Sequence, residues 1–140
     1  MKILLAGHPY NLYDELIGKT ITNFLTNLDI EMIYSDNIPH TIIDKECQKI
    51  STDINWTHSK EMLASINYYQ DKVDGIIIIS SFPCGPDSLS NELISHKIKT
   101  TPVITLIFED LNSEAGIITR LESFVDILTN IKEKNYVKNN

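Results

Sequence analysis

The fold of this chain is most constrained by one run of residues, Val73 to Ser80, which contains four successive isoleucines. Successive side chains of a strand point to opposite faces, so Ile76–Ile79 would make both faces apolar. Such strands are typical of parallel sheets that helices cover on each side, and β-branched residues favour strands. We therefore predict a central parallel strand over 75–80, with Ile76–Ile79 almost wholly buried.

Three further short apolar runs predict strands near residues 2–7, 30–34 and 102–108. Between and after the strands, apolar residues recur at intervals of three and four, which predicts helices with one buried stripe each. The helices are expected near residues 13–28, 59–71, 87–98 and 114–134, with a shorter one near 42–49. The expected stripe of the first helix includes Ile21, Phe24, Leu25 and Leu28, and that of the last is Ile117, Leu121, Phe124, Val125, Leu128 and Ile131.

This order of elements predicts a single α/β domain over residues 1–140, a length at which one domain is usual. Strands alternating with helices indicate a parallel sheet with helices on both faces. We expect a Rossmann-like three-layer sandwich whose four-stranded parallel sheet has the order 2-1-3-4. The polar tail 135–140 is expected to fray.

The net charge of −7 argues against nucleic acid and anionic membranes as partners. No apolar run approaches the roughly 18 residues that a membrane helix needs, and the amino end does not resemble a signal peptide. The two cysteines, Cys47 and Cys84, are too few for a disulfide framework. We therefore expect a cytoplasmic protein.

The turn that follows the isoleucine strand is the strongest candidate for chemistry, because it holds Cys84 between Pro83 and Gly85. Pro86 suits a first helical turn, and Asp87 or Ser88 is a natural N-cap. A cysteine just before the amino end of a helix lies in a positive field that favours the thiolate. The thiolate is the form that binds metals or attacks electrophiles. The alternative is a structural cysteine that fills space in a tight turn.

Other polar residues follow predicted strands at the same edge of the sheet. The candidates for binding a substrate or an anion are His8, Ser81, Asp87 and Ser88. Those for a structural or interface role are Glu109, Arg120 (the only arginine) and Glu122. Each group has a plainer interpretation: His8 as a polar loop residue, and Arg120 as a partner in an ion pair within its helix. No catalytic residue is identified.

Three segments, residues 2–10, 82–88 and 114–124, together resemble one family. In that order they are similar to the carboxyl-terminal domain of the 2-hydroxyacyl-CoA dehydratase superfamily, in the branch called acyl-CoA dehydratase activase-related, or CoA-enzyme activase, proteins. The resemblance covers nearly the whole chain. It implies an anaerobic [4Fe–4S] system in which an ATP-dependent activator supplies an electron at low potential, and the dehydratase removes water from a 2-hydroxyacyl-CoA.

The resemblance also implies a role for Cys84. In the family three cysteines hold the cluster, two from a preceding domain and one from the turn that matches Phe82-Pro83-Cys84-Gly85. Cys84 is thus the single candidate ligand, and the others would lie outside this chain, in an amino-terminal cysteine-bearing domain or a partner subunit. We expect no cluster in the isolated chain, because one thiolate forms no chelate.

These observations predict a domain of an iron–sulfur dehydratase- or reductase-type system that supplies one cluster ligand and an interface, and that has no turnover alone. The alternative is a non-catalytic binding or assembly module of flavodoxin-like fold, which binds a small anion or a nucleotide at the Cys84 turn. Whether the chain is a fragment or a stand-alone domain is left open by the residues.

Overall fold

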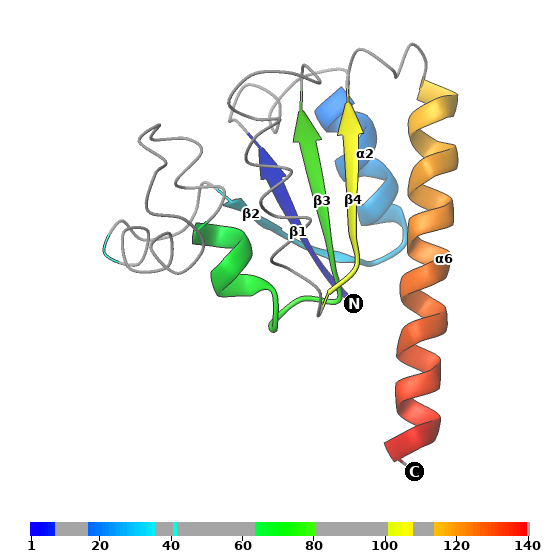
Figure 1. Ribbon diagram of the computed structural model, residues 1–140. Helices are drawn as coiled ribbons and strands as arrows, with labels where there is room; N and C mark the ends of the chain where they lie inside the picture. The colour runs from blue at the N-terminus through cyan, green and yellow to red at the C-terminus, as the bar shows by residue number, and fades with distance from the viewer. Residues whose placement is uncertain (8–16, 36–40, 42–63, 81–100, 108–113, 140) are drawn as a thin grey trace.

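A parallel four-stranded sheet forms the centre of the protein (Figure 1). The computed structural model describes residues 1–7, 17–35, 41, 64–80, 101–107 and 114–139. The strands are β1 (Lys2–Gly7), β2 (Glu31–Tyr34), β3 (Gly75–Ser80) and β4 (Val103–Ile107), in the order β2-β1-β3-β4. The predicted fold class, the four strand positions and their order are confirmed.

Helices cover both faces of this sheet, which makes a three-layer arrangement (Figure 1). Helix α2 (Ile17–Asn27) and helix α6 (Glu114–Asn139) cover one face. A helix whose described part spans 64–69 packs on the other. Alternation along the strands supplies both cores: Leu4 and Ile76 face the 64–69 helix, whereas Leu5 and Ile77 face α2 and α6.

The isoleucine strand lies where the sequence predicted, in the interior of the sheet. Ile76–Ile79 are at most 2% exposed, as expected. Residues of β3 pair with β1 on one side and with β4 on the other; Ile77, for example, lies between Leu5 and Ile104. Among the described strands, β3 and β1 are the two that are paired on both edges and buried on both faces.

Helix α2 ends at Asn27 because the chain turns into the left-handed region two residues later. Asp29 has φ 56°, a conformation that Asp tolerates better than most residues. The amide of Ile30 then donates back to the carbonyl of Leu25 at 3.0 Å, as at many helix ends. Leu28, predicted in the buried stripe, is 49% exposed because it lies in this turn.

Helix α6 differs from the prediction at its carboxyl end. It continues to Asn139, so the predicted end near Lys134 was too early. Its buried residues are Ile117, Leu121, Phe124 and Leu128, as predicted, with Val125 partly buried. Ile131, also predicted in the stripe, is 40% exposed. No helix in the described part of the chain is both long enough and apolar enough to cross a membrane.

One carboxylate links the amino ends of β1 and β3 to helix α6. Asp74, just before β3, accepts a hydrogen bond from the backbone amide of Lys2 at 2.8 Å and pairs with Lys132 of α6 at 3.7 Å. The Asp74 amide in turn donates to the Lys2 carbonyl at 2.8 Å. Asp74 thus links β1, β3 and α6 at the edge opposite to the predicted site.

Candidate functional site at the carboxyl edge of the sheet

The sheet order creates a switch point between β1 and β3. β2, which follows β1 in the sequence, lies beside β1 on the side away from β3. β4, which follows β3, lies beside β3 on the side away from β1. The two strands end together, with Gly7 paired to Ile79. In open α/β sheets, ligands bind outside the carboxyl ends of the strands at such a point. A site in this fold is therefore expected where the chain leaves Gly7 and Ser80.

Two buried serines brace this edge. Ser35, directly after β2, accepts a hydrogen bond from the Gly7 amide at 3.3 Å, and its hydroxyl lies 3.4 Å from the Gly7 carbonyl. Ser65, in the 64–69 helix, donates to the Ser35 carbonyl at 2.5 Å. Both serines are at most 1% exposed. Because their hydroxyl groups are engaged in fixing β1, β2 and the helix to one another, we assign them a supporting role.

Gly7 has no space for a side chain. A Cβ on Gly7 would lie 2.6 Å from the backbone carbonyl oxygen of Ile79, well inside van der Waals contact, and Gly7 has φ 159°. Since the obstacle is backbone, it cannot rotate away. The close approach of β1 and β3 at their carboxyl ends thus requires glycine at this position.

Most of the predicted site residues lie outside the described residues. His8 directly follows Gly7, Ser81 directly follows Ser80, and Glu109 is the second residue after β4. Also outside are Cys47, Cys84, Asp87 and Ser88. The structure therefore shows that the strand ends from which the His8 and Ser81 segments start are neighbours, and it describes none of these side chains.

Arg120 and Glu122 are the two predicted interface residues that the structure does describe. Both are exposed on α6. Two positions in an α-helix are separated by about 200° around its axis, so the two side chains leave different sides of α6. Neither is in an ion pair within the described residues, where the pairs are Lys2–Glu31, Lys72–Asp71 and Lys132–Asp74. Their exposure is compatible with the predicted interface role, which stays a prediction.

The described residues do not by themselves fit an iron–sulfur cluster. No group of three or more His, Cys, Asp or Glu side chains gathers among them in a way that would hold a metal ion. Both cysteines and all four histidines of the chain lie outside the described ranges. Cys84 is the fourth residue after the end of β3, and one thiolate is fewer ligands than such a cluster requires.

No model of a known protein family, no curated protein and no solved structure matches this chain. The similarity to the dehydratase superfamily therefore remains a prediction that depends on the three segments named for it.

The serine network at this edge was missed in the sequence. Ser35 directly follows the predicted strand 30–34, and Ser65 falls in the predicted helix 59–71; neither was among the predicted site residues. A small hydroxyl residue directly after a predicted strand was the available signal, because the backbone groups at a strand end need partners. Its contacts join residues roughly thirty positions apart, which periodicity cannot detect.

Proposed function

We propose that this chain is one domain of an iron–sulfur system of the 2-hydroxyacyl-CoA dehydratase or reductase type, in which it supplies one cluster ligand, Cys84, and an interface. The observation that supports the proposal is the sheet order. It makes β3 one of the two strands at the switch point, and the chain reaches Cys84 four residues after β3 ends at Ser80. Ligand sites of open α/β sheets are built by such segments.

The remaining ligands must come from elsewhere under this proposal. The chain has two cysteines, and no second cysteine lies close to Cys84 in sequence. We propose that an amino-terminal cysteine-bearing domain or a partner subunit supplies the other thiolates, and that an ATP-dependent activator reduces the assembled cluster. The isolated chain would then bind little iron and turn over no acyl-CoA.

Iron binding in the absence of oxygen tests the proposal. The chain is reconstituted with ferrous iron and sulfide, alone and together with a cysteine-bearing amino-terminal domain of a dehydratase-superfamily protein. Iron and sulfide per chain are measured after gel filtration. We expect cluster only in the mixture, its loss in Cys84→Ser, and its retention in the matched variant Cys47→Ser. Equal iron in both variants, or none in the mixture, would contradict the proposal.

A second function is favoured by the close packing at the same edge. The backbones of Gly7 and Ile79 lie so close together that no side chain fits between them, which leaves backbone groups at the switch point. Flavodoxin-like domains bind phosphate groups at such a point. The alternative is therefore a binding module for a small anion or a nucleotide. Thermal unfolding with phosphate, FMN and ATP tests it, since a ligand at 100 times its Kd stabilises the folded state by about 2.7 kcal/mol. An unchanged Tm with all three would contradict this alternative.

A further inference from the structure

Strand β4 lies at the edge of the sheet. Among the described strands it pairs with β3 alone. The carbonyl of Pro102 accepts the hydrogen bond from the amide of Ile76. Because residues of a parallel strand turn alternately to its two neighbours, the backbone groups of Val103, Thr105 and Ile107 are directed to the other side.

The sequence of β4 itself lacks the features that usually keep edge strands from pairing. Val103–Ile107 reads Val-Ile-Thr-Leu-Ile, with no charged residue and no proline inside the strand. Natural edge strands are commonly protected by lysine, proline or a bulge. An apolar edge strand without them is suited to pairing with another extended segment.

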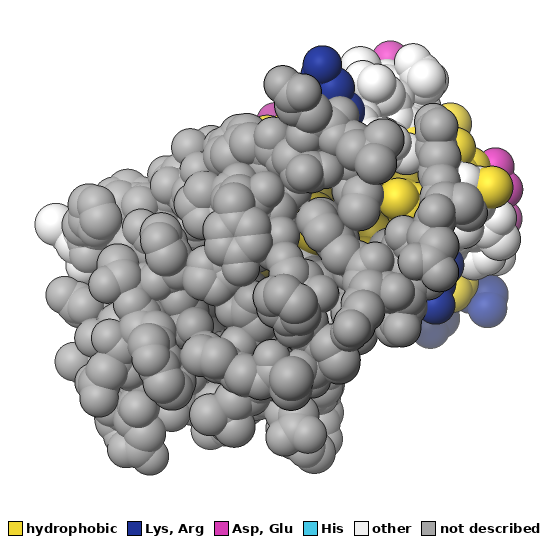
Figure 2. Space-filling view, turned by 90° about the horizontal axis from the view of Figure 1, so that it is seen from above, with side chains coloured by type: hydrophobic (Ala, Val, Ile, Leu, Met, Phe, Trp, Pro, Cys, Tyr) yellow, Lys and Arg dark blue, Asp and Glu magenta, His cyan; other side chains and the backbone are white. Residues whose placement is uncertain are grey.

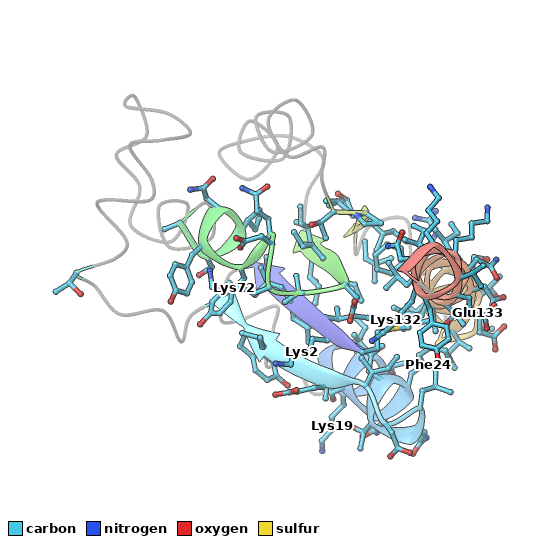
Figure 3. The ribbon with its side chains drawn as sticks, turned by 90° about the horizontal axis from the view of Figure 1, so that it is seen from below. Lys2, Lys19, Phe24, Lys72, Lys132 and Glu133 are labelled. Carbon is cyan, nitrogen blue, oxygen red and sulfur yellow. The ribbon has the colours of Figure 1, made fainter. Side chains whose placement is uncertain are left out.

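The flank of α6 turned away from α2 carries exposed isoleucines. Lys132 and Phe24 lie on the α2 side of α6 in Figure 3. Each residue advances about 100° around a helix, so Ile131 and Ile127 lie on the opposite side of the buried Leu128 from Lys132. They are 40% and 52% exposed. Helix α6 packs over the same core as Leu106 of β4, so this flank adjoins the β4 side of the sheet.

The same flank is basic. The helical period places Arg120, Lys134 and Lys138 within about 40° of the line through Ile127 and Ile131, whereas the acidic residues Glu122, Asp126 and Glu133 lie on the outer side. The two signs of charge occupy different sides of α6 in Figure 2 and Figure 3, where Glu133 points outward. None of the three basic residues is in an ion pair within the described part of the chain.

We propose that the outer edge of β4, which no described strand pairs with, and this flank of α6 form one docking surface for an acidic, extended segment of another protein, which adds to the sheet as a fifth strand. Its backbone would pair with Val103 and Thr105, its apolar side chains would cover Ile127 and Ile131, and its carboxylates would meet the basic residues. A doubly wound sheet of order 2-1-3-4-5 has its fifth strand at this position. The proposal does not depend on Cys84 or on the proposed function.

A second copy of this chain fits the surface less well. A two-fold axis that joined the β4 edges would place like surfaces against each other. The basic flank of one α6 would then face the basic flank of the other, and like charges in contact disfavour the pair. Charge complementarity therefore selects a partner that carries carboxylates.

The test uses three blocked synthetic peptides of eight residues as probes: one alternates Val with Glu, one alternates Val with Lys, and one has the acidic composition with a central proline. Each is titrated into the ¹⁵N-labelled chain, and amide shifts and hydrogen exchange are followed by NMR. We expect the Val-Glu peptide to shift and protect the amides of Val103 and Thr105, and to bind at least tenfold more tightly than the other two.

Variants locate the surface without disturbing the core. The pair Lys134→Glu and Lys138→Glu, or Ile127→Glu alone, should weaken binding of the Val-Glu peptide at least fivefold. Lys19→Glu and Leu28→Glu, exposed positions on or after α2, serve as matched controls and should leave it unchanged. Equal binding of the acidic and basic peptides, no shift at β4, or a concentration-dependent dimer that protects the β4 amides without peptide would overturn the proposal.

Discussion

The two halves of helix α6 have the same regular backbone but very different surroundings. In the first half, Ile117, Leu121, Phe124 and Leu128 are at most 4% exposed. In the second half, Ile131 is 40% exposed, and Tyr136 and Val137 are each 72% exposed. Figure 1 shows the second half extending past the amino ends of the strands.

Length explains this difference. A helix of 26 residues is about 39 Å long at 1.5 Å per residue. The five residues of β4 span only about 17 Å. The sheet can therefore cover roughly half of α6, whatever apolar residues the rest contains. The first half contributes to stability, and the second half is available for contacts with other molecules.

The largest effect is expected from a matched pair of substitutions, Ile117→Ala in the first half of α6 and Ile131→Ala in the second. Ile117→Ala removes a side chain that is 2% exposed and should lower the free energy of unfolding by about 2–5 kcal/mol. Ile131→Ala, at a position in the second half that is 40% exposed, should change it by less than about 0.5 kcal/mol. Urea unfolding of both variants measures the difference. Similar losses for the two would contradict the division of α6.

A smaller effect is expected at the contact between β3 and α6. A Cβ on Gly75 would lie 2.6 Å from Cδ1 of Leu128 and 3.0 Å from Cζ of Phe124. These atoms are the ends of flexible side chains, so Gly75→Ala should cost only about 1 kcal/mol. In the double variant Gly75→Ala, Leu128→Ala, the free energy of unfolding should fall by less than the sum of the two single decreases. The reason is that the new methyl group enters the space that Leu128 leaves. Strictly additive changes in the free energy of unfolding would show that a side chain at position 75 does not contact Leu128.

The smallest effect concerns Lys132, where α6 leaves the sheet. Its ammonium group pairs with Asp74 at 3.7 Å, but its side chain is 56% exposed. Exposed pairs contribute little, so Lys132→Met should cost less than about 1 kcal/mol, and the loss should shrink in high salt. Lys134→Met, which removes a lysine without an ion pair in the described region, is the control. A salt-independent loss well above 1 kcal/mol would mean that Asp74 anchors the second half of α6.

The sheet could be predicted from the sequence because its strands are short apolar runs with clear ends. The helical stripes were predicted less fully. Periodicity identifies which side of a helix is apolar, but it carries no information on how far the helix extends beyond the end of the sheet. For that reason Ile131 was assigned to the buried stripe, although it is 40% exposed.

The candidate site could be predicted only as a place. The order of the strands determines which chain segments start at the switch point, and that order follows from local patterns together with the rules of right-handed connections. The contacts that brace the edge join Gly7, Ser35 and Ser65, which are far apart in sequence. The same holds for the contact of Gly75 with α6. Long-range contacts of this kind leave no periodic signal in one sequence.

The reactivity of the two thiols tests the central claim, that Cys84 is a thiolate poised for ligation, most directly. The native chain and the chain unfolded in urea are treated with iodoacetamide without oxygen, and labelling at each cysteine is followed by mass mapping. The ratio of native to unfolded rate removes the intrinsic reactivity of each peptide. The proposal predicts a ratio near or above one for Cys84 and a much lower ratio for Cys47, since thiolate character and access control the rate. An inert Cys84 beside a rapidly labelled Cys47 would contradict it.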